Sequence, residues 1–265
     1  MRVGERNLTK IADAIFRRRN YIAARNMLRL YEHPIDMFRR YLTHRGDYPH
    51  TVQVRTPMSG IALQLYSPHD VLTINEIFCR NDYRADQADE VIVDFGSNIG
   101  ISAAYFLTRN PGAYTYLFEP LPSNVARLHA NLRPFDGRYE LQQAAVTLNG
   151  GDVEFGWEPS GRYGGVNNDH LDNVMTVPSV NSRKVLEDVL AKHGHIDVLK
   201  IDIEGLEETI VQNIPLEMAR KIKKLFVEAI FETNPLAQTH SMIHYGGIAQ
   251  FALLDVQAQL VRTAA

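Results

Sequence analysis

The stretch "VIVDFGSNIGISAAYFL", residues 91–107, joins a short apolar run to a glycine-containing loop and then to a run of small and apolar residues. The first part is typical of a buried strand and the last part of a closely packed helix. Gly96 and Gly100 permit sharp backbone turns, and Asn98 tolerates left-handed geometry. A loop of this kind at a strand end predicts a ligand site.

Downstream of this stretch, predicted strands and helices alternate. Apolar runs predict strands at 91–95, 114–118, 139–146, 196–201 and 223–230. Helical segments are predicted at 99–109, 122–132, 181–193, 204–213 and 238–250. This alternation favours an α/β fold with a parallel sheet and helices on both faces. In such a sheet, ligands bind beyond the carboxyl ends of the strands.

The region before the sheet has a different pattern, so residues 1–88 are predicted to form an extension and residues 89–265 the main domain. Helices are expected over residues 1–45, with a break at Pro34. Alternating residues around a Pro-Met-Ser-Gly turn predict a hairpin at 51–65. The segment "SPHDVLTINEIFCRNDY" then reads as a capped helix leading into the main domain.

Composition limits the classes of protein to consider. The chain has 265 residues, of which 45% are hydrophobic and 22% charged, and this favours a globular protein with a substantial core. The single cysteine, Cys79, excludes an internal disulfide and a zinc site built from cysteines. We found no apolar run of membrane-spanning length and no signal-peptide pattern, so a cytoplasmic location is expected.

The head of the chain is basic. Residues 1–50 hold 11 Lys/Arg against 5 Asp/Glu, although the formal net charge of the whole chain is -3. Leu8, Ile11, Ile15 and Ile22 keep a roughly helical spacing. The favoured interpretation is a helical extension that packs on the body or on a second subunit, which makes a homodimer a candidate. Contact with an anionic membrane surface is the alternative, and nucleic-acid binding is not expected because no aromatic cluster suggests base stacking.

A second strand end carries an acidic residue. Glu119 follows Gly96 by 23 residues, the spacing at which a carboxylate can bind both hydroxyls of a ribose. The dinucleotide fingerprint requires glycines where this loop has Asn98 and Ile101. The loop therefore suits S-adenosylmethionine, which brings no phosphate and whose ammonium group can bond to loop carbonyls and to Asp94.

Five segments together resemble the FkbM-type family of S-adenosylmethionine-dependent methyltransferases. They are "VIVDFGSNIGISAAYFL", "YLFEPLPSNVARLHANL", "QQAAVTLNGG", "GRYGG" and "DVLKIDIEGLEETIV". The similarity covers about residues 50–250. It implies a class I, Rossmann-like methyltransferase sheet and transfer to an oxygen, commonly a hydroxyl of a sugar, of a polysaccharide or glycolipid precursor, or of a natural product.

The resemblance also implies roles for individual residues. The methionine end of the cofactor would be lined by Asp94, Gly96, Asn98 and Gly100, the ribose would meet Glu119, and the adenine would border Ala144 and Ala145. The chain departs from the family in its closing segment, "FALLDVQAQLVRTAA", which is short for the antiparallel strand pair that ends this fold. The last hairpin is therefore expected to be abbreviated, or the sheet edge to be covered by another subunit.

Methylating a weakly acidic hydroxyl calls for a group that accepts its proton. In "IDIEG", Asp202 and Glu204 follow a strand and are the first catalytic candidates, although Glu204 could instead cap the next helix. His240 is a further candidate base, and on a helix it would share a face with His244. Glu228, at the end of the fifth strand, would bind substrate. A divalent metal on Asp202, Glu204, Glu228 and a histidine is a weaker hypothesis, so no metal is assigned.

The segment 155–173 is the longest without clear periodicity. It contains Trp157, Arg162 and Tyr163, and an aromatic ring with an arginine and nearby amides suits recognition of a saccharide acceptor. Alternatively, Trp157 covers the hairpin formed by "GGDVEF". Two other functions stay open, a nicotinamide-dependent oxidoreductase and a catalytically silent binding module on the same fold.

Overall fold

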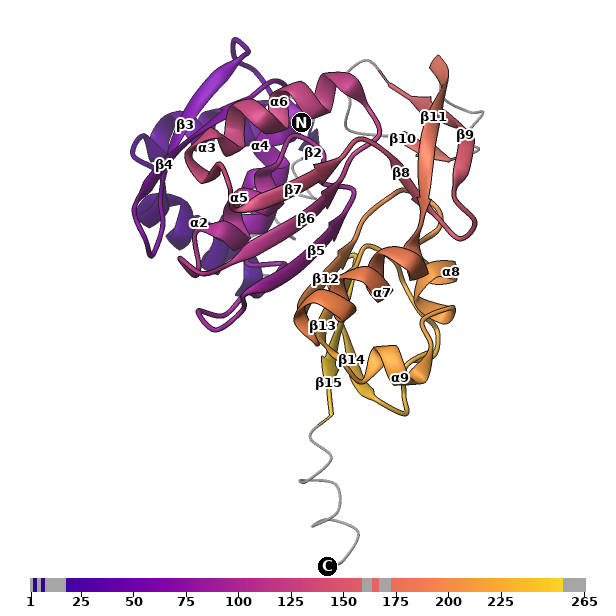
Figure 1. Ribbon diagram of the computed structural model, residues 1–265. Helices are drawn as coiled ribbons and strands as arrows, with labels where there is room; N and C mark the ends of the chain where they lie inside the picture. The colour runs from indigo at the N-terminus through magenta and orange to yellow at the C-terminus, as the bar shows by residue number, and fades with distance from the viewer. Residues whose placement is uncertain (1, 4–5, 8–17, 159–163, 167–172, 255–265) are drawn as a thin grey trace, which may run out of the picture.

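The computed structural model describes residues 2–3, 6–7, 18–158, 164–166 and 173–254. At its centre is a seven-stranded sheet in the order β14-β15-β13-β12-β5-β6-β7 (Figure 1). The strands are β5 (Val91–Phe95), β6 (Tyr114–Phe118), β7 (Tyr139–Gln142), β12 (Ile196–Ile201), β13 (Ile222–Val227), β14 (His240–Tyr245) and β15 (Ile248–Leu253). Neighbouring strands from β13 to β7 are parallel, and β15 is antiparallel to both of its neighbours.

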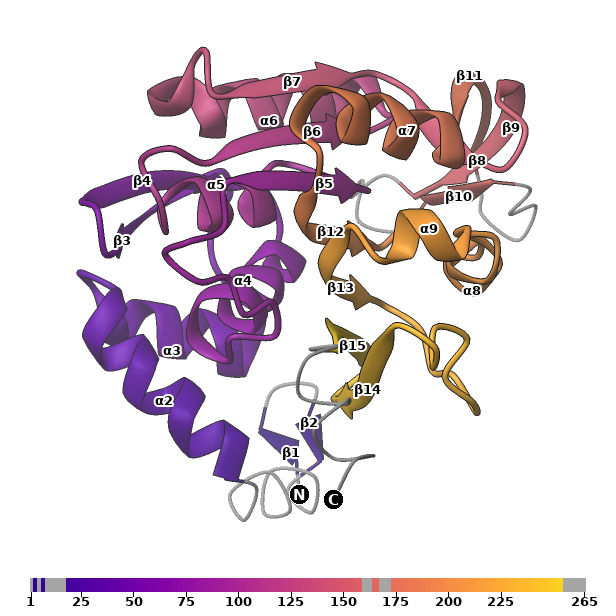
Figure 2. The same ribbon diagram turned by 60° about the horizontal axis from the view of Figure 1, so that its bottom comes forward.

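Helices cover both faces of this sheet, as predicted. One face carries α5 (Ile101–Leu107) and α6 (Pro122–Leu132), which continues into the 3-10 turn Arg133–Phe135. The other carries α7 (Ser182–His193), α8 (Glu207–Gln212) and α9 (Leu216–Ala219), which lie in front of the sheet in Figure 2. Successive side chains of β5 point to opposite faces of the sheet. Ile92 packs in the core on the α5 side, whereas Val91 and Val93 pack in the core on the α7 side. Apolar residues on both faces make β5 a central strand.

The prediction of a helix at 238–250 is wrong, because these residues form most of the β14–β15 hairpin. Both strands have six residues and are joined through Gly246, which has a φ of 69°. Val227 pairs with Ala249, so the hairpin extends the sheet beyond β13. The expectation of an abbreviated closing hairpin is therefore also wrong: the pair is complete, and it lies earlier in the chain than expected.

The extension contains the predicted hairpin and capped helix. Its elements are α2 (Arg18–Leu30), α3 (Pro34–Thr43), β3 (His50–Arg55), β4 (Gly60–Leu65), α4 (Pro68–Ile74) and a π-helix at Asn75–Cys79. Ser67 and Asp70 form a reciprocal capping box at the start of α4. Pro34 begins α3 and thereby separates it from α2, as predicted.

At the N-terminus the helical prediction holds only in part. Two short strands, β1 (Arg2–Val3) and β2 (Arg6–Asn7), pair where a helix was expected. Leu8, Ile11 and Ile15 lie outside the described residues, and Ile22 on α2 is 40% exposed. The extension shares one apolar core with α5 and α6, so the division into 1–88 and 89–265 stays a prediction. Among the described helices, none has the length and apolarity needed to cross a membrane.

A second, four-stranded sheet follows β7. It has the order β10-β9-β11-β8 and consists of β8 (Ala145–Thr147), β9 (Gly151–Trp157), β10 (Gly164–Val166) and β11 (Asn173–Asn181). The predicted strand 139–146 is therefore two strands, β7 in the central sheet and β8 in this one. Figure 1 shows the small sheet at the end of the central sheet where β5 and β6 terminate. The small sheet therefore lies next to the carboxyl ends of the central strands, where the ligand site is expected.

Candidate functional site

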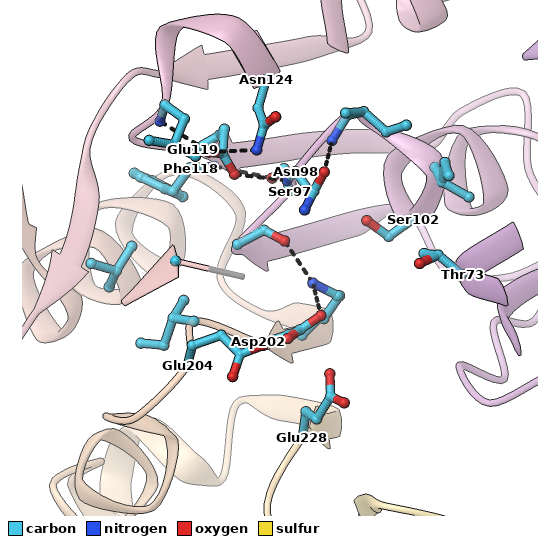
Figure 3. A pocket seen from close by; sticks show the side chains of 18 of the residues that line it. Thr73, Ser97, Asn98, Ser102, Phe118, Glu119, Asn124, Asp202, Glu204 and Glu228 are labelled. Carbon is cyan, nitrogen blue, oxygen red and sulfur yellow. Dashed lines mark hydrogen bonds and ion pairs between the residues drawn. The ribbon is translucent and has the colours of Figure 1, made fainter. Parts of the chain in front are cut away.

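A cavity of ≈ 280 Å³ opens at the carboxyl ends of the central strands (Figure 3). Its lining comes from the loops after β5, β6, β12 and β13 and the start of α5, from the α4–π-helix segment of the extension, from β8, β9 and β10 of the small sheet, and from the turn between β14 and β15. Of the residues predicted for the site, it brings together Gly96, Asn98, Glu119, Ala144, Ala145, Asp202, Glu204 and Glu228.

The glycine loop has the sharp turns that its sequence predicts. Gly96, Asn98 and Gly100 have φ values of 83°, 47° and 84°. A Cβ on Gly96 would lie 1.7 Å from the carbonyl oxygen of Asp202, so this glycine lets two strand ends meet. A Cβ on Gly100 would lie 3.0 Å from the side chain of Leu128 on α6. Gly100 thus serves helix packing and does not line the cavity.

Every backbone N–H of the loop from Gly96 to Gly100 donates to an acceptor within the protein. The first two donate to the carbonyl of Phe118, at 3.1 and 2.9 Å. The N–H of Asn98 donates to Glu119 at 3.0 Å, and that of Ile99 to the Asn98 side chain at 2.7 Å. Gly100 donates to the carbonyl of Ser97 at 2.9 Å. The loop therefore presents none of these five donors to a ligand.

Glu119 is buried at the cavity wall, with 5% of its surface exposed. Its Oε2 accepts from Asn98 N, and its Oε1 accepts from Leu121 N at 3.0 Å and from Asn124 Nδ2 at 3.2 Å. Burial nevertheless raises the pKa of this carboxyl to about 7. A carboxylate offers about four acceptor positions, so Glu119 can accept a further hydrogen bond from a ligand hydroxyl. Beside it, the small side chains of Ala144 and Ala145 leave room for a flat ring.

Beneath the loop lies a buried lysine that the sequence analysis missed. Lys200 Nζ lies 3.0 Å from Asp94 Oδ1 and 3.3 Å from Asp202 Oδ2, and it donates to the Gly96 carbonyl at 2.9 Å. Burial acts to lower the pKa of Lys200, but the charges of Asp94 and Asp202 outweigh burial and raise it. Asp94 is fully buried and also accepts from Ser102 at 2.5 Å, so it supports the loop from behind the cavity wall. The signal in the sequence was a charged residue inside the apolar strand "IDVLKI".

Asp202 and Glu228 form a pair of carboxyls at the ends of β12 and β13 (Figure 3). The charge of Asp202, together with burial and a hydrogen bond between the two side chains, raises the pKa of Glu228 well above its usual value. Glu228 therefore holds its proton more tightly than an isolated carboxyl would. The pair is thus a candidate site for receiving and releasing a proton.

Glu204 lines the cavity but does not cap the following helix. The N-cap of α8 is Leu206, and Glu207 instead accepts from the N–H groups of Ile203 at 2.9 Å and Gly205 at 2.8 Å in the preceding turn. Glu204 has a left-handed φ of 59°, unusual for a residue with a side chain. A Cβ on Gly165 would lie 2.4 Å from the Glu204 carbonyl, so the small sheet closes tightly over this turn.

The two histidines do not reach the cavity. His240 is on a strand, and not on a helix as predicted; its Nε2 lies 2.9 Å from the carbonyl of Ile222, at the opposite end of β13 from Glu228. His244 Nε2 accepts from Phe231 N at 3.2 Å. No group of three or more His, Cys, Asp or Glu in the described part of the chain could hold a metal ion.

The predicted acceptor loop is described only in part. Trp157 packs, partly buried, against the cluster of Leu121, Ala145, Phe155 and Val177, and it is not among the cavity residues. This placement corresponds to the alternative in which Trp157 covers the hairpin. Arg162 and Tyr163 lie outside the described residues. From this region, the side chains of Phe155 and Val166 and the backbone of Gly164 line the cavity instead.

The extension contributes cavity residues that the sequence analysis did not single out. They are Asp70, Thr73, Glu76, Ile77, Arg80, Asp82 and Tyr83. Residues 73, 76, 77 and 80 have the three-, four- and seven-residue spacing of one helix face, and this was the available signal. The main domain therefore holds only part of the site.

Comparison with known proteins supports the resemblance seen in the sequence. Residues 94–244 match the family model described as the Methyltransferase FkbM domain. The chain is 31% identical over 143 residues to the 2-O-methyltransferase NoeI of Sinorhizobium fredii, covering 48% of this chain and 58% of NoeI. It is 26% identical over 223 residues to the AMB antimetabolite synthetase AmbE of Pseudomonas aeruginosa, covering 64% of this chain and 10% of AmbE. A solved structure of Methyltransferase FkbM from Methylobacillus flagellatus KT is 15% identical with a TM-score of 0.39, covering 70% of this chain and 54% of that one.

Proposed function

Because this chain belongs to the FkbM family of methyltransferases, we propose that it transfers a methyl group from S-adenosylmethionine to a hydroxyl oxygen of a sugar, of a polysaccharide or glycolipid precursor, or of a natural product. The chain spans 58% of NoeI and 10% of AmbE, the curated relatives it matches. NoeI is a 2-O-methyltransferase, and this supports an oxygen acceptor here.

One observation carries the choice of cofactor. The loop beside Glu119 donates all five of its N–H groups, from Gly96 to Gly100, to the protein itself. A dinucleotide needs such donors to bind its pyrophosphate, whereas S-adenosylmethionine has no pyrophosphate. The carboxylate of Glu119 and the small residues Ala144 and Ala145 suit the adenosine that both cofactors share. The loop thus favours S-adenosylmethionine over a nicotinamide cofactor.

The chemistry requires a group that accepts a proton from the acceptor. When bound, S-adenosylmethionine supplies a methyl group activated by a positive sulfonium. The acceptor hydroxyl loses its proton as its oxygen is methylated, and the carboxylate of Asp202 receives it, beside Glu228, which already holds a proton of its own. Lys200 holds the Asp202 carboxylate in place from beneath the cavity floor. Glu204, on the adjoining turn, is positioned to bind an acceptor hydroxyl.

The net charge of the cavity lining indicates which class of acceptor molecule it suits. Its described lining contains seven acidic side chains, Asp70, Glu76, Asp82, Glu119, Asp202, Glu204 and Glu228, against the two basic side chains Arg80 and Lys200. A polyanion such as nucleic acid is disfavoured by this excess of negative charge. Carboxylates accept hydrogen bonds from hydroxyls, so a saccharide or another small polyhydroxylated molecule suits the cavity.

The test is a transfer assay with methyl-labelled S-adenosylmethionine and a panel of neutral sugars, glycosides and glycolipid extracts. The proposal predicts label in a base-stable ether on at least one acceptor, with loss of transfer in Asp202→Asn. Binding of S-adenosylmethionine without transfer to any acceptor would favour the catalytically silent module. Binding of NAD in its place would favour the oxidoreductase.

A further inference from the structure

The amino-acid end of the cofactor needs a cation that the glycine loop does not supply. This inference rests on the proposed function, since it concerns the same cofactor. The methionine part of S-adenosylmethionine carries a carboxylate, and a buried carboxylate requires charge-assisted hydrogen bonds. The five N–H groups from Gly96 to Gly100 are already used within the protein. A side chain must therefore bind this carboxylate.

Two cationic side chains occur among the described cavity residues, Lys200 and Arg80. Lys200 has 2% of its side chain exposed and is held between two carboxylates, Asp94 and Asp202, and the carbonyl of Gly96. Three partners match the three N–H donors of an ammonium group. Lys200 is thus committed to the protein, and Arg80 is the cation left for a ligand.

Arg80 is held in a fixed orientation at the end of the π-helix. Its backbone N–H donates to the carbonyl of Asn75 at 2.8 Å, a five-residue spacing that belongs to a π-turn. Its Nε lies 2.7 and 2.9 Å from the two oxygens of Asp82, and Nη2 also pairs with Asp82 and lies 3.4 Å from Glu76. These contacts use Nε and Nη2, and Nη1 makes none with the described residues. The side chain is 23% exposed and lines the cavity.

Tyr83 connects Arg80 to the loop end of the cavity. It directly follows Asp82, the partner of Arg80, and its ring centroid lies 5.8 Å from Lys200 Nζ. The ring is fully buried, and among the charges that act on its hydroxyl are those of Asp202 and Asp94. Arg80 is therefore linked through Asp82 and Tyr83 to the group of charges that supports the glycine loop, where the methionine end is expected.

We propose that Arg80 binds the carboxylate of the methionine part of S-adenosylmethionine through Nη1. In this arrangement Asp82 orients the guanidinium, and the extension completes the cofactor site that the glycine loop leaves open. Arg80 is a binding residue and takes no part in proton transfer.

The test compares two ligands that differ at the amino-acid end. S-adenosylhomocysteine carries the methionine-type carboxylate, whereas 5′-methylthioadenosine has the same nucleoside and thioether without it. Calorimetric titration of Arg80→Met is expected to show S-adenosylhomocysteine binding weakened about 10- to 100-fold and 5′-methylthioadenosine binding changed less than about twofold, the loss typical of one charged hydrogen-bonded pair. Glu119→Gln should weaken both ligands alike.

Two further variants keep the test decisive. Arg80→Met leaves Asp82 buried and unpaired, so the double variant Arg80→Met/Asp82→Asn is measured beside it and should show the same selective loss. Arg84→Met makes the same change in charge at an exposed arginine outside the cavity and should leave both affinities unchanged. Equal loss of both ligands, or loss of neither, in the double variant would overturn the role of Arg80. Failure of the wild type to bind either ligand would instead overturn the proposed function.

Discussion

The carboxyl edge of the parallel strands and the β14–β15 hairpin contrast in what their polar residues do. At the carboxyl edge, Gly96, Glu119, Asp202 and Glu228 come from four strand ends and line one cavity. In the hairpin, the imidazole of His240 instead bonds to the carbonyl at the start of β13. A residue's place in the topology therefore indicates a site better than its chemical type does.

The largest expected effect is at Asp202. Asp202→Asn keeps the size of the side chain and removes the carboxylate that receives the acceptor proton. We expect kcat to fall by a factor of about 10² to 10⁴, the usual contribution of a general base. Steady-state assays on the acceptor found by methyl labelling, at saturating cofactor, provide the measurement. A kcat within about threefold of wild type would remove Asp202 from the mechanism.

The next effect is on stability, where the ends of the neighbouring parallel strands β5 and β12 meet. Gly96→Ala would place a Cβ 1.7 Å from the Asp202 carbonyl at a φ of 83°. We expect it to lower the free energy of unfolding by about 3 kcal/mol or more. The matched control is Gly137→Ala, which has a similar φ of 77° but no atom within 4 Å of its Cβ. This control should lower the free energy of unfolding by only about 1–2 kcal/mol. Equal losses for the two variants in urea unfolding would contradict the close approach of Gly96 to the Asp202 carbonyl.

Cofactor affinity should depend on pH through Glu119. Its carboxyl has a pKa of about 7, and the ribose hydroxyls bind the charged form. The affinity for the cofactor is therefore highest well above pH 7 and decreases as the pH falls. If protonated Glu119 does not bind the ribose, the affinity drops about tenfold between pH 8 and pH 6. Without cofactor, pH affects the stability of the fold in the opposite direction. The folded protein binds the Glu119 proton more tightly than the unfolded chain, where the pKa is about 4.5. The contribution of protonated Glu119 to the free energy of unfolding is therefore lost as the pH rises from 4.5 to 7. Titrations of wild type and Glu119→Gln across this range test it, and the variant should bind weakly with no such pH dependence.

The smallest expected effect on catalysis is at His240. His240→Ala removes the hydrogen bond to the Ile222 carbonyl and one of the two contacts of the Thr239 hydroxyl, which keeps the Leu236 carbonyl, so unfolding free energy should drop by about 1–3 kcal/mol. The kcat of the folded variant should stay within about twofold of wild type. A folded variant with kcat reduced tenfold would return His240 to the list of catalytic candidates.

The sequence was most informative where short-range patterns decide the structure. Strands 91–95, 114–118 and 196–201 have the predicted bounds, because each is a mostly apolar run followed by a polar or glycine residue. Asn98 is left-handed as predicted. The hairpin was mistaken for a helix because the four-residue spacing of His240 and His244 fits one helix face, although the Gly-Gly pair at 246–247 is the usual signal for a two-residue turn.

The parts of the site that could not be predicted depend on contacts between distant segments. Lys200 pairs with Asp94, which is 106 residues earlier, and Arg80 reaches the cavity only because the extension packs against α5 and α6. The sequence marks Lys200 as a charge inside an apolar strand and Arg80 as part of a helix face, but neither signal names the partner. Motifs therefore located the residues at the strand ends that line the cavity, and packing between distant segments determined the rest.

The most direct test of the central claim is calorimetric titration of the wild-type protein and Glu119→Gln with S-adenosylmethionine and, separately, with NAD. The proposed site predicts that the wild type binds S-adenosylmethionine, that Glu119→Gln weakens this binding about 10-fold or more, and that NAD does not bind. Binding of NAD, or an affinity for S-adenosylmethionine unchanged in Glu119→Gln, would contradict the assignment of this strand-end carboxylate and its loop to the cofactor.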